Sequence, residues 1–95
     1  MRKIHLFVSG RVQGVFYRHF AIQKARQLGL SGWIRNRLDG RVEAVVIGPE
    51  KKLDRMLIWF WQGSPLAKVG KITIISQKEI SQDPFKGKFE KRKTV

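Results

Sequence analysis

Two spaced glycines and an arginine follow an apolar segment near the N-terminus, in the run from Ser9 to His19. Gly10 and Gly14 permit positive φ angles or a close approach of the backbone to a ligand, and Arg18 offers a planar, permanently charged fork for phosphate oxygens. Where a helix starts, backbone N–H groups lack partners within the helix, and the helix dipole favours negative charge. The run is therefore typical of an anion-binding loop, although its spacing alone also fits an ordinary strand-to-helix turn.

Asn36 is the second residue whose chemistry would suit such a loop. Its amide carries two donor hydrogens and an acceptor oxygen and does not titrate, so it can hold a water molecule and orient it. An asparagine at the end of a strand also commonly starts a turn, and the turn signal Asp39-Gly40 follows. Its position relative to Arg18 decides between the two roles.

The elements that must position these residues follow from hydrophobic periodicity and turn signals. Alternating apolar residues predict strands, which in chain order cover residues 4–12, 33–36, 42–47 and 69–76. Apolar residues at helical spacing predict two helices, one from residue 17 to Gly29 and one from Pro49 to Gly63. In the basic tail, Phe85 and Phe89 are expected to act as anchors, with a short edge strand near the terminus.

This order of elements predicts an α+β fold, the ferredoxin-like split βαβ sandwich (βαββαβ), with two helices on one face of a four-stranded antiparallel or mixed sheet, to which a short fifth strand at the C-terminus can add. The first two strands are joined through a helix and run parallel, so the loop and Asn36 end at the same edge of the sheet. The third strand returns between them and leaves a gap of about 10 Å, which a phosphorylated small molecule could bridge. Residues 1–95 are expected to form a single domain.

The composition favours an anionic partner without identifying it. The formal charge is +13, from 20 Lys and Arg against 7 Asp and Glu. Such a charge attracts phosphorylated metabolites, nucleic acid and acidic lipid alike, and the basic residues are spread along the whole chain. The longest apolar run, residues 56–61, is far shorter than the roughly 20 residues of a membrane span, and no signal peptide is recognisable, so a soluble cytoplasmic protein is expected.

Several chemistries are excluded or disfavoured by the residues themselves. The chain has no cysteine, which excludes disulfides, thiolate zinc sites and cysteine-dependent phosphatases. Its acids show no spacing typical of a magnesium or calcium site, and the P-loop signature is absent. His19 follows Arg18 on a helix and should point about 100° away from it, into solvent, while His5 is expected on the sheet surface.

Two long motifs carry a resemblance to a known family. The run GRVQGVFYR over residues 10–18, followed by GWIRN over 32–36 and DGxVE over 39–43, resembles the acylphosphatase family. The resemblance extends from residue 3 to about 76. It implies a small ferredoxin-like enzyme that hydrolyses the mixed anhydride of a carboxylic acid and phosphate, giving carboxylate and inorganic phosphate, with neither metal nor cofactor.

The resemblance also implies roles for the site residues. Arg18 would bind the phosphoryl group, and Asn36 would position the attacking water. Loop N–H groups would share in binding phosphate; these belong to Gln13, Gly14, Val15, Phe16, Tyr17 and Arg18. The expected partners are an acyl phosphate and inorganic phosphate, bound by a monomer that does not engage a membrane.

The sequence departs from the family pattern at two places away from these residues. The second helix ends with Gly63-Ser64-Pro65, where proline often follows glycine directly. Lys91, near the C-terminus, occupies a position that is usually apolar, which leaves the packing of the closing strand open.

Two other functions compete with hydrolysis. Four-stranded sheets of this arrangement also bind RNA through aromatic residues on the open face, where Phe7 and Trp33 are expected, although the RNA-binding sequence motif is missing. An acylphosphatase-like domain that serves a larger carbamoyl-transfer protein is a third interpretation, which the length of the chain disfavours.

Overall fold

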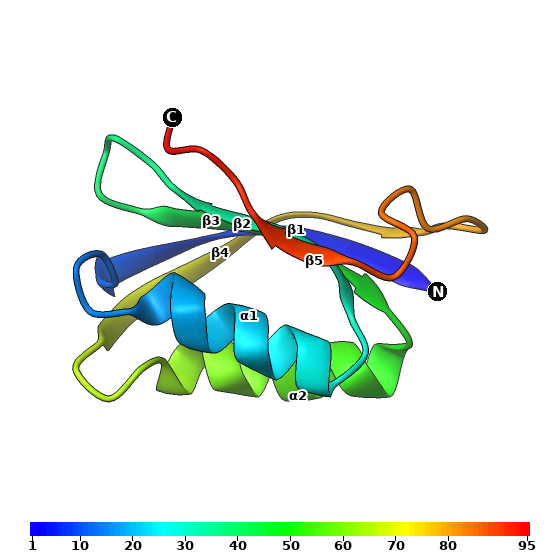
Figure 1. Ribbon diagram of the computed structural model, residues 1–95, viewed down its shortest axis with the longest axis horizontal. Helices are drawn as coiled ribbons and strands as arrows, with labels where there is room; N and C mark the ends of the chain where they lie inside the picture. Colours follow the sequence, from blue (N-terminus) through cyan, green and yellow to red (C-terminus); the bar gives the residue numbers. More distant parts are fainter.

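The computed structural model describes residues 1–95, which form five strands and two helices (Figure 1). In chain order these are β1 (Arg2–Arg11), α1 (Tyr17–Gln27), β2 (Ser31–Asn36), β3 (Val42–Gly48), α2 (Glu50–Gln62), β4 (Lys68–Glu79) and β5 (Phe89–Lys91). Both helices lie on one face of the sheet. The predicted ferredoxin-like α+β arrangement is confirmed, including the short C-terminal strand, and β4 continues three residues beyond the predicted end at residue 76.

The strand order places β3 between β1, which leads into the predicted loop, and β2, which ends at Asn36. The order is β4-β1-β3-β2-β5, with β2 and β5 parallel and every other pair antiparallel. Val42 of β3 pairs with Val8 of β1 on one side and with Asn36 of β2 on the other. Val8 and Asn36 are therefore two strand spacings apart, about 10 Å, and the loop after β1 begins at this edge.

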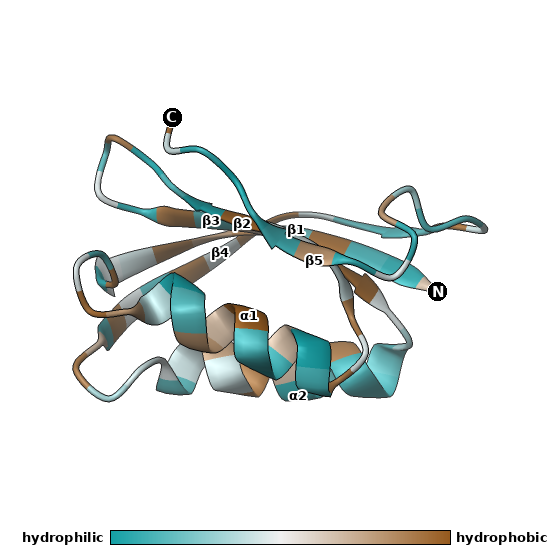
Figure 2. Ribbon diagram, viewed as in Figure 1, coloured by the Kyte–Doolittle hydropathy of each residue, from teal (hydrophilic) through white to brown (hydrophobic).

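The core lies between the sheet and the helices. Ile4, Leu6 and Val8 alternate along β1 toward the helices, as the period of a half-buried strand requires. The helices contribute their apolar stripes to the same cluster, namely Tyr17, Ala21, Ala25, Leu53, Met56 and Phe60. Apolar and polar segments accordingly alternate along the strands and helices (Figure 2). No helix has the length and apolar character that crossing a membrane requires.

The sheet face away from the helices carries a smaller cluster of Trp33, Val45 and Ile47, against which Ile80 and Phe85 pack. As expected, Phe7 and Trp33 belong to this face, but they do not form an open platform. Trp33 is only 8% exposed. Guanidinium groups cover both rings; the pairs are Arg35 and Arg92 on Trp33, each at 4.8 Å, and Arg37 and Arg41 on Phe7, at 5.0 and 4.1 Å.

Glu43 lies in the middle of this open face and is only 4% exposed. His5 Nε2 is 2.6 Å from its Oε2, and Arg35 and Arg37 donate to its Oε1 at 2.8 and 3.1 Å. Burial alone would raise the pKa of Glu43, but these hydrogen bonds outweigh it and hold the pKa below its usual range. His5 therefore takes the predicted place on the sheet surface as part of an ionic cluster.

Candidate active site

The loop between β1 and α1 passes twice through left-handed backbone conformations. Gly14 has φ 74°, and Phe16, the residue before α1, has φ 60°. Glycine adopts this conformation readily, whereas for phenylalanine it costs free energy and persists only where the surroundings fix it. The Phe16 side chain is 72% exposed, so its own packing does not supply that free energy. The rest of the molecule must hold the loop in shape.

Hydrogen bonds from two distant segments hold this loop. Ser64, just after α2, donates from its buried Oγ to the Val15 carbonyl at 2.7 Å. The Gln13 amide donates to the carbonyls of Arg37 at 2.7 Å and Arg41 at 2.9 Å in the β2–β3 hairpin. Because these partners are 24 to 49 residues apart in the chain, no local pattern signals them. The sequence indicated only a turn at Ser64 and a backbone role for Gln13.

Tyr17 supports the first turn of α1 from below. Its hydroxyl donates to the Phe60 carbonyl at 2.8 Å, and its ring centroid lies 5.2 Å from that of Trp59. Burial raises the pKa of Tyr17, so the phenol keeps its proton at ordinary pH. Its side chain is a structural support for the loop and not an acid or base.

The backbone N–H groups from Gln13 to Arg18 remain available to a ligand. None of them donates a hydrogen bond to another group of the protein. The helix that begins here has no capping side chain and no acidic residue in its first turn. Unpaired donors and the positive end of the helix dipole therefore meet at the loop, which is a suitable environment for an anion.

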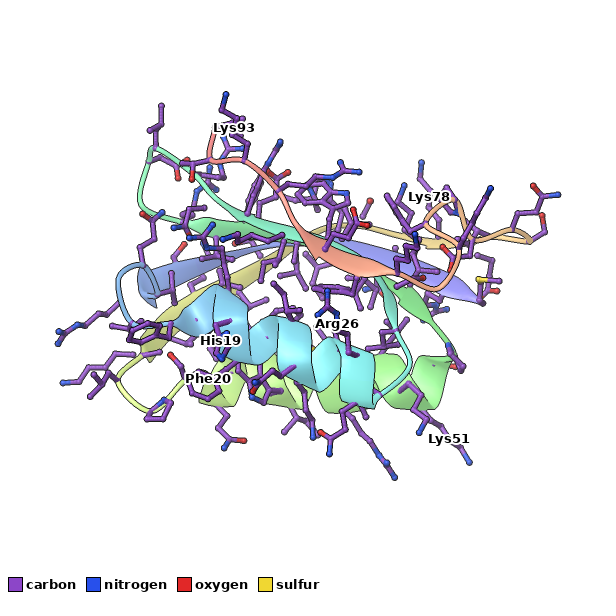
Figure 3. The ribbon with its side chains drawn as sticks, viewed as in Figure 1. His19, Phe20, Arg26, Lys51, Lys78 and Lys93 are labelled. Atoms are coloured by element: carbon purple, nitrogen blue, oxygen red, sulfur yellow. The ribbon has the colours of Figure 1, made fainter.

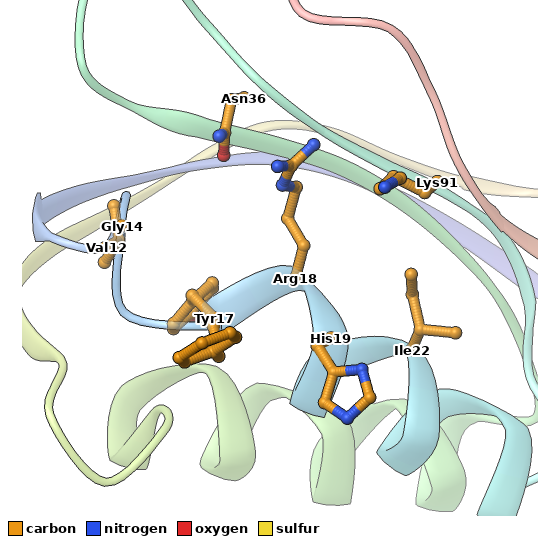
Figure 4. Close-up of a pocket in the computed structure, with 9 residues that line it drawn as sticks. Val12, Gly14, Tyr17, Arg18, His19, Ile22, Asn36 and Lys91 are labelled. Atoms are coloured by element: carbon orange, nitrogen blue, oxygen red, sulfur yellow. The ribbon is translucent and has the colours of Figure 1, made fainter.

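A cavity of about 450 Å³ opens beside this loop (Figure 4). Arg18 reaches across it from α1 toward the sheet, where the Asn36 side chain projects from the end of β2. The lining residues are Val12, Gly14, Phe16, Tyr17, Arg18, His19, Ile22, Asn36 and Lys91. The cavity thus joins the loop, the start of α1, and the ends of β2 and β5.

Asn36 contributes an unusual feature to this cavity. Its Oδ1 is buried and accepts no hydrogen bond. Leaving a buried polar atom without a partner costs about 1 to 3 kcal/mol, and most such atoms in folded proteins are paired. An oxygen held this way at a cavity wall is prepared to accept a hydrogen bond from a small molecule such as water.

The charge of the cavity is entirely positive. Arg18 is half-buried and forms no ion pair, and Lys91 adds a second cation at the rim. No acidic side chain lines the cavity. No group of three or more His, Asp or Glu residues is arranged to hold a metal ion. The cavity therefore favours an anionic ligand.

The structure brings most of the sequence-predicted site residues together. Arg18 and Asn36 face one cavity, and Gly14, Phe16 and Tyr17 line it. Gln13 and Val15 do not line it; the Gln13 side chain is turned to the hairpin, and that of Val15 lies in the core. Their N–H groups still belong to the unpaired set of the loop.

Four further lining residues were not expected at the site: the apolar Val12 and Ile22, and the polar His19 and Lys91. His19 lies at the rim, yet its exposed ring points away from Asn36, in agreement with the predicted solvent position (Figure 4). Lys91, a lysine at a position that is usually apolar, reaches the cavity through β5. Its deviation from an apolar position was the one signal that could have found it.

Comparison with known proteins gives a consistent result. Residues 4–90 match the family model for acylphosphatase. Acylphosphatases of Methylococcus capsulatus and Bordetella parapertussis are 52% and 42% identical, over 73% and 90% of this chain and 75% and 89% of theirs. The crystal structure of acylphosphatase from Bacillus subtilis, 36% identical, has a TM-score of 0.89 and matches 97% of this chain and 99% of that one. On sequence and fold together, this chain belongs to the acylphosphatase family of hydrolases.

Proposed function

We propose that Arg18, Asn36 and the N–H groups of residues 13–18 carry out acyl phosphate hydrolysis in this chain. The supporting observation is the buried, unpartnered Asn36 Oδ1, which faces the same cavity as the unpaired Arg18 guanidinium. A phosphoryl group on the loop would accept hydrogen bonds from the N–H groups and from Arg18. A water molecule that donates to Asn36 Oδ1 would then lie on the sheet side of the phosphorus.

The reaction needs positioning and charge stabilisation more than proton transfer. The water oxygen attacks phosphorus, the bond from phosphorus to the acyl oxygen breaks, and the leaving group departs as a carboxylate. The proton released by the water remains on the inorganic phosphate. Because a carboxylate is a good leaving group, no strong general acid is required, in keeping with a cavity that has no acidic lining.

Arg18 and the loop donors would act where negative charge gathers. In phosphoryl transfer the charge is spread over the three equatorial oxygens, which these donors would surround. Their geometry is fixed in advance by the bonds from Ser64 and Gln13, so little reorganisation is needed during reaction. Removing one such donor typically costs about 3 kcal/mol of transition-state stabilisation, or roughly a hundredfold in rate.

The test is hydrolysis of benzoyl phosphate by the full chain, with and without a chelator. We expect turnover that the chelator does not abolish, and a loss of roughly a hundredfold in kcat/KM for Arg18→Ala and Asn36→Ala. Arg11→Ala is the matched control, because Arg11 is exposed beside the loop and does not line the cavity. Near-normal rates in both site variants would reject these assignments, and loss of turnover on chelation would reject metal independence.

Nucleic-acid binding has weaker support. The net charge of +13 favours it, but arginines cover the aromatic rings that would stack on bases. Arg35 lies on Trp33 and pairs with Glu43, and Arg41 lies on Phe7 and pairs with Asp39. If this were the function, the affinity for a single-stranded RNA would fall steeply with salt. An affinity unaffected by salt, or no binding, would exclude it.

A further inference from the structure

Lys91 lies on the helix-facing side of the sheet. In the parallel pairing of β5 with β2, Phe89 lies beside Gly32 and Lys91 beside Ile34. Side chains alternate along a strand, and Phe89 is only 1% exposed because it belongs to the core between sheet and helices. Lys91, two residues further on, therefore points to the same side of the sheet as Phe89 and lies next to the core.

This row ends at the active-site cavity. Asn36 follows Ile34 by two residues on β2 and shares its face, so Asn36 and Lys91 are separated by about one strand spacing and two residues of strand rise. Their Cα atoms are accordingly about 8 Å apart. Figure 4 shows the Lys91 side chain directed toward Arg18.

The position of β5 is fixed against both layers. The Arg92 N–H donates to the Ile34 carbonyl at 2.8 Å, and Arg26 of α1 donates to the Phe89 carbonyl at 3.1 Å. Figure 3 shows Arg26 between α1 and the strand above it. Lys91 is thus carried by a strand that is bonded to β2 and to the helix that carries Arg18.

The ammonium group of Lys91 has no counter-ion in the protein. It forms no ion pair, and its neighbour Glu90 lies on the opposite side of β5 by alternation. The cavity of about 450 Å³ is larger than a phosphate group of five heavy atoms fills. Room and positive charge therefore extend from Arg18 toward Lys91 and Ile22, where the rest of a substrate would lie.

We propose that Lys91 makes this chain select acyl phosphates whose acyl group carries a second negative charge, and that it does so by pairing with that charge while the phosphoryl group occupies the loop. The inference rests on the proposed function of Arg18 and Asn36. A carboxylate or a second phosphate on the acyl group would serve equally. Because Lys91 is exposed, the preference is about two- to fivefold and weakens as salt is added.

The test compares kcat/KM for 4-carboxybenzoyl phosphate and benzoyl phosphate, whose rigid rings differ by one carboxylate. We expect the ratio of the two values to fall about two- to fivefold in Lys91→Met, chiefly through KM, and to be retained in Lys91→Arg. Lys93→Met is the control, because Lys93 is an exposed lysine two residues beyond the end of β5, outside the cavity and away from the helices (Figure 3). That variant keeps the ratio of the unaltered chain.

The outcomes separate this proposal from the one it rests on. Hydrolysis of both substrates with an unchanged ratio in Lys91→Met overturns the role of Lys91 and leaves Arg18 and Asn36 in place. An equal fall of the ratio in Lys91→Met and Lys93→Met also overturns it, because the effect would then be general attraction. Failure of the unaltered chain to hydrolyse either substrate overturns both proposals. Lys91→Gln provides a second neutral variant should Lys91→Met fold poorly.

Discussion

Arg18 of α1 and Arg35 of β2 lie on opposite sides of the sheet, and they differ in whether their charges are paired within the protein. On the open face, Arg35 donates to Glu43 and stacks on Trp33, and the buried carboxylate has three partners. On the helix side, Arg18 has no ion pair, and the oxygen of Asn36 and the loop N–H groups have no partner. Satisfied charges indicate a structural cluster, whereas several unsatisfied groups around one cavity indicate a binding site.

The largest effect on stability is expected for Glu43→Ala. Removing this buried carboxylate leaves the partly exposed His5, Arg35 and Arg37 without their shared partner, and the loss of its charge-assisted hydrogen bonds costs about 3 kcal/mol. The free energy of unfolding, measured with urea, should fall by this amount, while the folded variant keeps its kcat/KM for benzoyl phosphate. A large loss of kcat/KM with little change in stability would mean that the open face belongs to the site.

Ser64→Ala should affect stability and activity together. It leaves the buried Val15 carbonyl without a donor, at a cost of about 2 kcal/mol. The loop then loses one of its supports, so we expect a lower kcat for benzoyl phosphate as well. Urea unfolding and steady-state kinetics measure the two effects. Ser76→Ala on β4 is the control, since Ser76 forms no side-chain hydrogen bond in the structure. Unchanged kcat in Ser64→Ala would show that the loop does not depend on this bond.

Inorganic phosphate should stabilise the folded protein through Arg18 and not through Arg35. A ligand that binds only the folded state at ten times its Kd raises the free energy of unfolding by about 1.4 kcal/mol. We expect phosphate to stabilise the unaltered chain and Arg35→Ala, and to lose most of this effect with Arg18→Ala. Thermal unfolding at increasing phosphate concentration gives the measurement. Equal protection of Arg18→Ala and the unaltered chain would place the main anion site elsewhere.

The smallest effect is a dependence of stability on pH that belongs to the open face. The folded-state pKa of Glu43 is lowered, so its charge stabilises the fold above the unfolded pKa of about 4.3 and this contribution is lost as pH falls through the folded pKa. The stability difference between the unaltered chain and Glu43→Gln should therefore shrink as the pH falls below about 4.3. Urea unfolding at several pH values measures it; a difference that grows on acidification would contradict the direction of the pKa shift.

The parts of this molecule that follow local rules were predictable from the sequence. Strand alternation, the turn at Asp39-Gly40 and the glycine after α1 predicted the elements, and their order predicted that Arg18 and Asn36 meet at one edge. The end of β4 was not predictable in this way. Beyond residue 76 the strand is polar and exposed, and it is extended by pairing with the start of β1, whose partner residues lie far away in the chain.

The site residues that the sequence did not reveal also depend on contacts between distant segments of the chain. Lys91 enters the cavity only because β5 pairs in parallel with β2, and Ser64 reaches Val15 only because α2 ends beneath the loop. Each of these contacts depends on tertiary packing, so no periodic pattern of residues in the sequence signals it. At Lys91 the only signal in the sequence is the residue type itself, a charged side chain where the strand pattern expects an apolar one.

The bonds of Gln13 restrict what evolution or design could place at its position. Its amide nitrogen uses both hydrogens on the carbonyls of Arg37 and Arg41. A glutamate of the same length would offer no hydrogen, would set a carboxylate against two carbonyl oxygens, and would bring negative charge to a loop suited to anions. The hairpin therefore requires an amide and not an acid at this position, so a single nitrogen atom links the residue type in the loop to the shape of the neighbouring hairpin.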